Sequence, residues 1–256
     1  MTARIHLARG VAVEDGCARL LGETAHYLRN VLRLGEGDRV ILFDDEGYER
    51  DGVLESLSGR EAVLRLGPAR PSAAEPAVEV SLLFCLIKGD AADRVIRGAT
   101  EIGVSRFLPA LARRSVARPT AARAEARRER WQRIAREACR QCGRSRVPAI
   151  EEIADLGAAL AHPAVGSAGQ RLFFATGQGR ALADALDPEA RSAALAVGPE
   201  GGFSSEEERA LEAAGFIRVS LGPRVLRAVT AGLVVPALVL GRLEGQGQRA
   251  SVQADV

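Results

Sequence analysis

Three features follow one another in Ala196-Val-Gly-Pro-Glu-Gly-Gly-Phe-Ser-Ser-Glu-Glu-Glu208: an apolar run typical of a buried strand, a glycine-rich turn, and the start of a helix. Ser204 is a favourable N-cap, and Glu207 lies three residues later, at the spacing of a capping box. Gly201 and Gly202 permit positive φ and let a ligand approach the main chain closely. The stretch therefore predicts a turn at the ligand-binding edge of an open α/β sheet, with a plain tight turn as the alternative.

A second stretch repeats this organisation about twenty residues later: Ile217-Arg-Val-Ser-Leu-Gly-Pro-Arg-Val-Leu-Arg227. It is a short apolar strand and a turn that run directly into another predicted helix. Two such loops at the carboxyl ends of neighbouring parallel strands can form the walls of one pocket.

The remainder of the chain from residue 77 alternates between strand and helix patterns. We expect strands at 78–87, 107–111, 171–176, 193–197 and 217–221. We expect helices at 90–102, 120–142, near 152–161, at 181–186, from 205, and from about 228 to about 243. This alternation predicts an α/β domain with a parallel sheet and helices on both faces.

Residues 1–66 have a different pattern, with short alternating runs broken by glycines, which predicts a small β-barrel or sandwich. One helix is expected at about 23–34, with a buried stripe of Leu28, Val31 and Leu32. Its opposite face carries polar residues that can grip a phosphate backbone or simply face solvent: His26, Arg29, Asn30 and Arg33. A proline-rich stretch follows, so we predict a domain at 1–70, a linker at 71–76, a second domain at 77–244 and a flexible tail at 245–256.

The composition is that of a soluble globular protein, with 47% hydrophobic and 27% charged residues in 256. No apolar run is expected to reach the ~18 residues of a membrane span, and the N-terminus lacks the apolar region of a signal peptide. We therefore expect a cytoplasmic protein that does not associate with membranes. Four cysteines in such a chain predict reduced thiols.

Charge is unevenly distributed along the chain. Residues 111–150 carry 12 arginines and 3 glutamates, a net charge of +9, whereas the whole chain carries +2. A localised basic segment favours a polyanionic partner such as nucleic acid. The alternative is a solvated helix face in an arginine-rich protein, since Lys88 is the only lysine in the sequence.

Other motifs give weaker signals. Cys139 and Cys142 have the spacing of half a metal or redox site, but they share a helical stripe with Trp131, so we expect core packing and no metal. Gly177-Gln-Gly179 is similar to the start of a dinucleotide fingerprint, but Leu182 occupies the third glycine position, and a nicotinamide oxidoreductase stays an open alternative. Neither a Gly-Lys-Ser/Thr phosphate loop nor a Gly-x-Ser-x-Gly elbow occurs in the sequence.

Taken together, the two Gly-Pro loops resemble those of the small-subunit ribosomal RNA uridine-N3 methyltransferases, a family of the SPOUT class. Three further segments agree: Lys88-Gly-Asp90 leading into Ala99-Thr-Glu-Ile-Gly-Val104, the block from Trp131 to Pro148, and His26-Tyr-Leu-Arg-Asn-Val-Leu-Arg33. The last is similar to a helix of the family's N-terminal PUA-like domain. The resemblance covers nearly the whole chain.

The resemblance implies a PUA-like β-barrel that binds RNA, an α/β domain with a deep trefoil knot, and a homodimer. It also implies S-adenosylmethionine as cofactor and methylation of N3 of one uridine in 16S rRNA or the small ribosomal subunit. Carried over residue by residue, the cofactor pocket consists of Thr176, Gly177, Gly198, Pro199, Glu200, Gly201, Gly202, Leu221, Gly222, Pro223, Val225 and Leu226.

The sequence departs from the family at two places beside this pocket. After Arg227 the family usually continues Thr-Glu-Thr-Ala, but here Ala228 and Val229 precede Thr230, so an acid is absent at 229. The loop 175–179 also lacks a glutamate that is frequent there. The resemblance therefore transfers the fold and cofactor more directly than the target nucleotide or the catalytic step.

Methyl transfer to N3 of uridine requires that N3 lose its proton, which a base or a cation beside the uridine promotes. We expect Arg224 and Arg227 to supply the cations and Glu200 the acid, with Glu101 and Arg144 as candidates that orient the site. The target base must leave its stack, and no metal is needed. We predict phosphate contacts from Arg29, Arg33, Lys88, Arg113, Arg130, Arg133, Arg140 and Arg144.

Two alternatives besides the oxidoreductase stay open. One is an RNA methyltransferase of the same class with another target nucleotide. The other is a non-catalytic RNA-binding or ribosome-assembly protein that keeps the fold.

Overall fold

The computed structural model of the chain describes residues 3–6, 11, 13–115 and 118–254, with side chains described up to residue 245. Its contacts divide the chain into two compact units. The first comprises Met1–Glu75 and Cys139–Val147, and the second comprises Pro76–Ala138 and Pro148–Val256. The chain passes from one unit to the other after Glu75, after Ala138 and after Val147, whereas the sequence predicts one linker, at 71–76. The four predicted domain ranges stay a prediction.

The short alternating strands of the first unit pair into one sheet. Within the described ranges it has seven strands in the order β1-β4-β5-β6-β3-β2, and β7 pairs with β5. Their bounds are β1 Ala3–His6, β2 Val13–Glu14, β3 Cys17–Leu21, β4 Arg39–Phe43, β5 Tyr48–Leu57, β6 Glu61–Leu66 and β7 Arg70–Pro71. Neighbours are antiparallel except for the parallel pair β1 and β4. A small N-terminal β-sheet domain is therefore confirmed, while its closure into a barrel stays a prediction.

The helical segment of this unit differs from the expected regular helix at 23–34. A short α-helix, α1 (Glu23–His26), continues as a π-helix, η1 (Tyr27–Val31). Leu28 is buried in the core as predicted, but Val31 is 60% exposed, so its assignment to the buried stripe is wrong. A π-turn holds more residues than an α-turn and shifts the phase of every later side chain, which turns Val31 outward.

The carboxylate of Glu75 connects the two sequence segments of the first unit. Oε1 of Glu75 accepts hydrogen bonds from the main-chain N–H groups of Ser145 at 2.6 Å and Arg146 at 2.7 Å. Its Oε2 pairs with the guanidinium of Arg144 at 3.1 Å, and Arg144 is only 2% exposed. Glu75 therefore compensates the buried positive charge of Arg144, which would otherwise destabilise the fold. It also fixes the main chain of Ser145 and Arg146, just after the helix Ala121–Cys142.

The second unit is built on a parallel sheet, as the strand–helix alternation predicts. Among the residues described it has eight strands in the order β10-β9-β8-β14-β12-β15-β13, and β11 pairs with β9. The bounds are β8 Glu79–Cys85, β9 Arg106–Leu111, β10 Ala149–Ile150, β11 Ala154–Asp155, β12 Gln170–Phe174, β13 Arg180–Ala181, β14 Ser192–Val197 and β15 Ile217–Ser220. Every pair is parallel.

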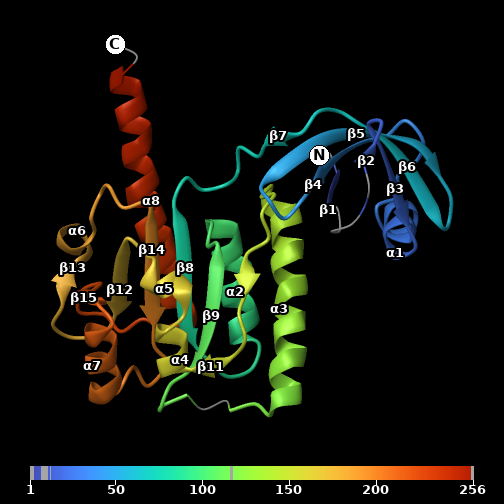
Figure 1. The fold of residues 1–256 in the computed structure, drawn as a ribbon. Helices are drawn as coiled ribbons and strands as arrows, with labels where there is room; N and C mark the ends of the chain where they lie inside the picture. The colour runs from blue at the N-terminus through green and yellow to red at the C-terminus, as the bar shows by residue number, and fades with distance from the viewer. Residues whose placement is uncertain (1–2, 7–10, 12, 116–117, 255–256) are drawn as a thin grey trace. The chain divides into compact units, whose positions relative to one another are not determined.

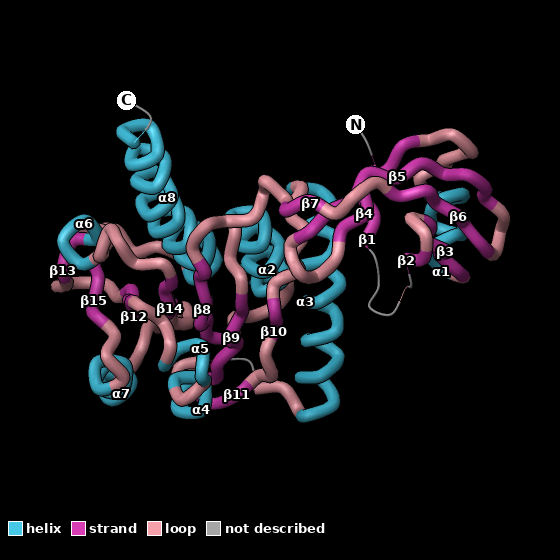
Figure 2. The backbone as a smooth tube through the Cα atoms, turned by 45° about the horizontal axis from the view of Figure 1, so that its top comes forward, coloured by secondary structure: helices cyan, strands magenta, loops and turns pink. Residues whose placement is uncertain are grey.

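Helices cover both faces of this sheet (Figures 1 and 2). Their bounds are α2 Ala91–Ile102, α3 Ala121–Cys142, α4 Leu156–Leu160, α5 Pro163–Gly166, α6 Leu182–Ala185, α7 Ser205–Ala213 and α8 Ala228–Ala254. On one face of the sheet, α8 contacts β8, β14 and α2. Glycines let α2 and α8 approach each other closely, because a Cβ at Gly98 would meet Leu233 and a Cβ at Gly232 would meet Val95. On the other face a core cluster joins Phe173 and Leu108 of the sheet to Leu156, Val165 and Leu211 of α4, α5 and α7.

The last helix is longer than its sequence pattern indicates. We expected it to end at about Leu243, before a polar tail, but α8 continues to Ala254; residues 255–256 lie outside the described ranges. The window Ala228–Gly245 has the length and composition of a membrane span despite Arg242 and Glu244. Core helices of soluble proteins also pass that test, and here Val235, Val239 and Leu240 are buried in the second unit.

Trp131 is the main packing contact between α3 and the sheet. It is 1% exposed, its ring meets Phe84 edge-on with 5.9 Å between centroids, and its Nε1–H donates to Asp93 at 3.0 Å. We expect Trp131→Ala to lower the free energy of unfolding by about 3–5 kcal/mol, because it leaves a large cavity. Urea unfolding followed by circular dichroism measures this. The control Arg133→Ala, on the exposed side of the same helix, should change stability by no more than about 0.5 kcal/mol; equal losses in both variants would contradict the packing argument.

Candidate functional site

The order of three parallel strands brings the glycine-rich loops together. Strand β12 pairs with β14 on one side and with β15 on the other, and all three run in the same direction. Their carboxyl ends, and hence the loops 175–179, 198–204 and 221–227, therefore lie at one edge of the sheet. The two Gly-Pro loops were predicted from their residues to share a pocket, and the family resemblance added Thr176 and Gly177 of the third loop, which lies between them.

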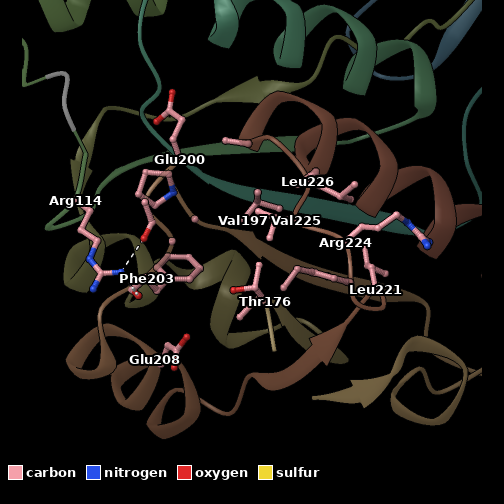
Figure 3. Close-up of a pocket in the computed structure, with 18 of the residues that line it drawn as sticks. Arg114, Thr176, Val197, Glu200, Phe203, Glu208, Leu221, Arg224, Val225 and Leu226 are labelled. Atoms are coloured by element: carbon pink, nitrogen blue, oxygen red, sulfur yellow. Dashed lines mark hydrogen bonds between the residues drawn. The ribbon is translucent and has the colours of Figure 1, made fainter. Parts of the chain in front are cut away.

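A cavity of about 240 Å³ is formed by these three loops (Figure 3). Of the residues predicted to bind a cofactor or act in catalysis, the lining includes Thr176, Gly198, Pro199, Glu200, Gly201, Gly202, Leu221, Gly222, Arg224, Val225 and Leu226. Gly177, Pro223 and Arg227 do not line it. The sequence missed four lining side chains with chemical or packing roles: Arg114, Phe174, Phe203 and Glu208.

The loop 198–204 is a tight turn held by its own hydrogen bonds. The N–H of Gly202 donates to the carbonyl of Pro199 at 2.8 Å, and Gly202 has a φ of 69° that favours glycine. The capping box at the start of α7 is present: the N–H of Ser204 donates to Glu207 at 2.7 Å, and the N–H of Glu207 donates to Ser204 Oγ at 3.3 Å. This confirms the sequence interpretation of the turn and helix start.

Two side-chain contacts fix this loop from the segment that follows β9. Nη1 of Arg114 donates to the carbonyls of Gly201 at 2.7 Å and Phe203 at 3.3 Å. The second oxygen of the Glu207 carboxylate accepts from the N–H of Arg113 at 2.6 Å. A Cβ at Gly201 would lie 3.2 Å from Cδ of Arg114, so any larger residue at this position would have to displace the Arg114 side chain that holds the loop.

The two glycines of the Gly-x-Gly motif, Gly177 and Gly179, are explained by the backbone conformation and packing of the loop 175–179. Gly177 has a φ of 86°, and a Cβ at Gly179 would lie 2.9 Å from the main-chain nitrogen of Ser220. Gly179 thus permits the chain to pass directly beside β15 before it pairs there as β13. These roles account for both glycines without a dinucleotide.

The loop 221–227 carries the predicted catalytic arginines. Gly222 has a φ of 96° and Val225 is 77% exposed. Figure 3 shows Arg224 and Glu200 on opposite sides of the cavity, with Thr176, Val197 and Val225 between them. Arg227 is exposed just before α8, where its carbonyl accepts from Ala231 at 2.8 Å. The two predicted cations and the acid therefore do not form a contiguous cluster.

The arginines predicted to bind RNA are found in both units. Arg29, Arg33 and Arg140 belong to the first unit, where Arg140 stacks on Tyr27 at 5.3 Å. Lys88, Arg113, Arg130 and Arg133 are exposed in the second unit, and Arg113 and Arg130 pair with Glu206 and Asp93. Arg144 is the exception. Because its guanidinium is buried against Glu75, it is not available to phosphate or to the pocket in this conformation, and we remove it from both predicted sets.

Cys85 and Cys139 are core residues, whereas Cys17 and Cys142 are half-buried. Burial raises the pKa of the Cys139 thiol to about 12 and also raises the pKa of the Cys85 thiol. A thiol with such a pKa carries little thiolate at neutral pH and is a poor metal ligand or nucleophile. Within the described ranges, no three His, Cys, Asp or Glu side chains are grouped so that they could hold a metal ion.

The fold and the site together define a two-unit α/β protein with a cavity between glycine-rich loops at the edge of a parallel sheet. Residues 74–240 match the RNA methyltransferase domain family, and residues 20–67 match the RNA methyltransferase PUA domain. The chain belongs to the ribosomal RNA small subunit methyltransferase E family, because it is 30% identical to a member from Bacillus subtilis over 91% of that relative's length.

Individual relatives agree over most of their length. The chain is 34% identical over 222 residues to the ribosomal RNA small subunit methyltransferase E of Synechocystis, covering 86% of this chain and 71% of the relative. It is 30% identical over 240 residues to that of Bacillus subtilis, covering 90% and 91%. The solved structure of the Neisseria gonorrhoeae ribosomal RNA small subunit methyltransferase E, bound to S-adenosyl methionine, is similar with a TM-score of 0.83 at 28% identity, covering 93% of this chain and 96% of that chain.

Gly201 offers a direct test of the pocket. We expect Gly201→Val to abolish binding of S-adenosylmethionine in calorimetry, because the new side chain would displace Arg114, which lines the cavity and holds the loop 198–204. Gly241→Ala is the matched control: a Cβ there meets nothing within 4 Å, and alanine suits a helix better than glycine. Wild-type affinity in Gly201→Val would show that the loop does not contact the cofactor.

Proposed function

We propose that this protein transfers a methyl group from S-adenosylmethionine to N3 of a uridine in 16S rRNA. The observation that carries the proposal is the cavity built by three glycine-rich loops at one edge of the parallel sheet, in a chain that belongs to a family of rRNA methyltransferases. The arginine-rich segment 111–150 adds an RNA-compatible charge.

The residues of the cavity suit this cofactor. Gly198 and Gly201 let the loop pack closely on two side chains of the cavity lining, since a Cβ at these positions would lie 3.2 Å from Phe203 and Arg114 respectively. Val197, Leu221 and Leu226 give the cavity apolar walls that can hold an adenine ring, while Thr176 and Glu208 place polar groups at its edge. When bound, S-adenosylmethionine supplies an electrophilic methyl group on a sulfonium.

The chain's own contribution is to align the uridine and to lower the cost of its ionisation. Arg224, at the cavity wall, is suited to stabilise negative charge that develops on the uridine. Glu200 is exposed at the opposite wall, where a carboxylate can accept the N3 proton directly or through water. Arg227 supplies further positive charge at the start of α8.

The RNA is proposed to contact basic side chains in both units: the exposed Arg29, Arg33, Lys88, Arg113, Arg130 and Arg133, and the half-buried Arg140. We further propose that residues 1–70 act as a PUA-like RNA-binding domain and residues 77–244 as the catalytic domain, with a trefoil knot around the cofactor loops. The protein is proposed to act as a cytoplasmic homodimer on 16S rRNA or the small ribosomal subunit.

Activity can be tested in cells that lack this protein. We expect mass spectrometry of 16S rRNA to lose one 3-methyluridine in their absence and to regain it with the wild-type chain. Arg224→Ala should lower the methylation rate about 10²-fold, because it removes a group that stabilises transition-state charge. Arg209→Ala, an exposed arginine on α7 outside the cavity, is the control. A methyl group found on another nucleotide would reassign the target, and no change in any rRNA nucleotide would refute the activity.

RNA binding has a separate signature. The logarithm of the binding constant should fall less steeply with the logarithm of salt concentration in Arg29→Ala/Arg33→Ala, by about one per lost phosphate contact. Arg191→Ala, an exposed arginine outside the basic segment, should leave the slope unchanged. Filter binding to a 16S rRNA fragment at several salt concentrations measures both slopes, and an unaltered slope in the double variant would exclude these contacts.

A second candidate function is favoured by one observation. Val229 occupies the position at the start of α8 where the family commonly has an acid. A chain without that acid can keep the fold and bind RNA as a ribosome-assembly protein without transferring a methyl group. Tight RNA binding without methyl incorporation, in the assays above, would decide for this function.

A further inference from the structure

Arg218, which does not line the cavity, contacts residues in two of the walls that form it. Arg218 lies on β15, directly opposite Phe173 of β12 in the parallel register. Its Nη1 donates to Oε2 of Glu208 at 2.6 Å, and its Nη2 donates to the carbonyl of Thr176 at 3.1 Å. Its guanidinium lies 5.9 Å from the centre of the Phe173 ring. All three contacts use the flat, forked geometry of a guanidinium, which a lysine cannot reproduce.

The two groups that Arg218 holds belong to different loops. Thr176 lies in the loop after β12, whereas Glu208 lies in the first turn of α7, after the loop 198–204. Both line the cavity, and Figure 3 shows both near its lower side, while Arg218 itself is not part of the lining. Arg218 therefore acts on the cavity only through these two groups.

The pair is placed where its charges matter. Arg218 and Glu208 are half-buried, so solvent screens their interaction less than it screens an exposed pair. Only Oε2 of Glu208 accepts a hydrogen bond within the described part of the chain, so Oε1 can still accept from a ligand hydroxyl or ammonium. A carboxylate held in one rotamer by a charge-assisted bond presents that free oxygen in a fixed direction.

We propose that Arg218 is a positioning residue for the cofactor. It orients the Glu208 carboxylate toward a hydroxyl or ammonium group of S-adenosylmethionine and fixes the carbonyl of Thr176, so that two of the three loops hold their ligand-binding geometry before binding. This inference rests on the proposed function, because it assumes that S-adenosylmethionine occupies the cavity.

Arg171 provides a matched control on the same sheet. It lies on β12 and donates to the carbonyls of Val165 at 2.8 Å, Gly166 at 2.8 Å and Ala214 at 3.3 Å. These carbonyls lie at the opposite end of the strand from the cavity. Arg171 is thus an arginine that fixes backbone carbonyls as Arg218 does, but it has no route to the ligand.

The experiment compares cofactor affinity with stability in the full chain. Calorimetry should show that Arg218→Ala weakens S-adenosylmethionine binding about tenfold, as expected for a lost charge-assisted contact. Arg171→Ala should lower Tm at least as much as Arg218→Ala and leave the dissociation constant unchanged. In turnover, Arg218→Ala should raise the KM for S-adenosylmethionine about tenfold while kcat and the KM for RNA stay within about twofold.

Two conservative variants keep the test decisive if Arg218→Ala does not fold. Arg218→Lys keeps the ion pair with Glu208 but cannot also reach Thr176, so its affinity should lie between those of wild type and Arg218→Ala. Glu208→Gln preserves the shape of the side chain and should weaken binding, and combining it with Arg218→Ala should cost less than the two separate effects together.

The possible outcomes separate the two proposals. Failure of the wild-type chain to bind S-adenosylmethionine would refute the proposed function. Wild-type binding with unchanged affinity in Arg218→Ala, or in both Arg218→Lys and Glu208→Gln, would refute the positioning role alone. An equal loss of affinity in Arg171→Ala and Arg218→Ala would also refute it, because the effect would then follow general destabilisation.

Discussion

The parallel pairing of β14, β12 and β15 is the constraint on which the site depends. Since neighbouring parallel strands end at the same edge, three loops that are separated by up to about fifty residues in sequence are brought side by side. The pairing is itself fixed by burial: Phe173, Ala194 and Ala196 face one helical layer, and a shift of one residue would turn them to the other face. The cavity is thus a consequence of strand register, and the loops only complete it.

Local signals in the sequence sufficed for much of this architecture. The capping box of Ser204 and Glu207 was predictable because both partners lie within one helical turn, and the central strands were predictable from continuous apolar runs. Features that depend on contacts between segments distant in the sequence were not predictable from it. The two-residue strands β10 and β11 exist only through their pairing with β9, and the outward turn of Val31 results from a π-helix with no sequence signature.

The same distinction applies to the site. Its glycines were predictable because they occur in compact motifs, whereas Arg114 and Arg218 act through partners remote in sequence. Arg114 lies 87 residues from Gly201, and Arg218 lies 42 residues from Thr176. The only local indication that Arg218 has a special role is its position in a short, mainly apolar strand. Conversely, Arg144 looked like an RNA contact in a basic segment, because a count of charges does not reveal that Glu75 buries it.

Arg114 and Arg218 reduce the conformational entropy that the glycine-rich loops would otherwise lose when a ligand binds. Glycine allows close approach of a ligand, but it also loses more conformational freedom on ordering than any other residue. If the loops were ordered only by the ligand, that loss would be subtracted from its affinity. Arg114 holds the carbonyls of Gly201 and Phe203 and Arg218 holds that of Thr176, so part of the ordering cost is met during folding. The loop 221–227 has no comparable side-chain brace to its carbonyls among the described residues, and we infer that it is the wall whose ordering most depends on the bound cofactor.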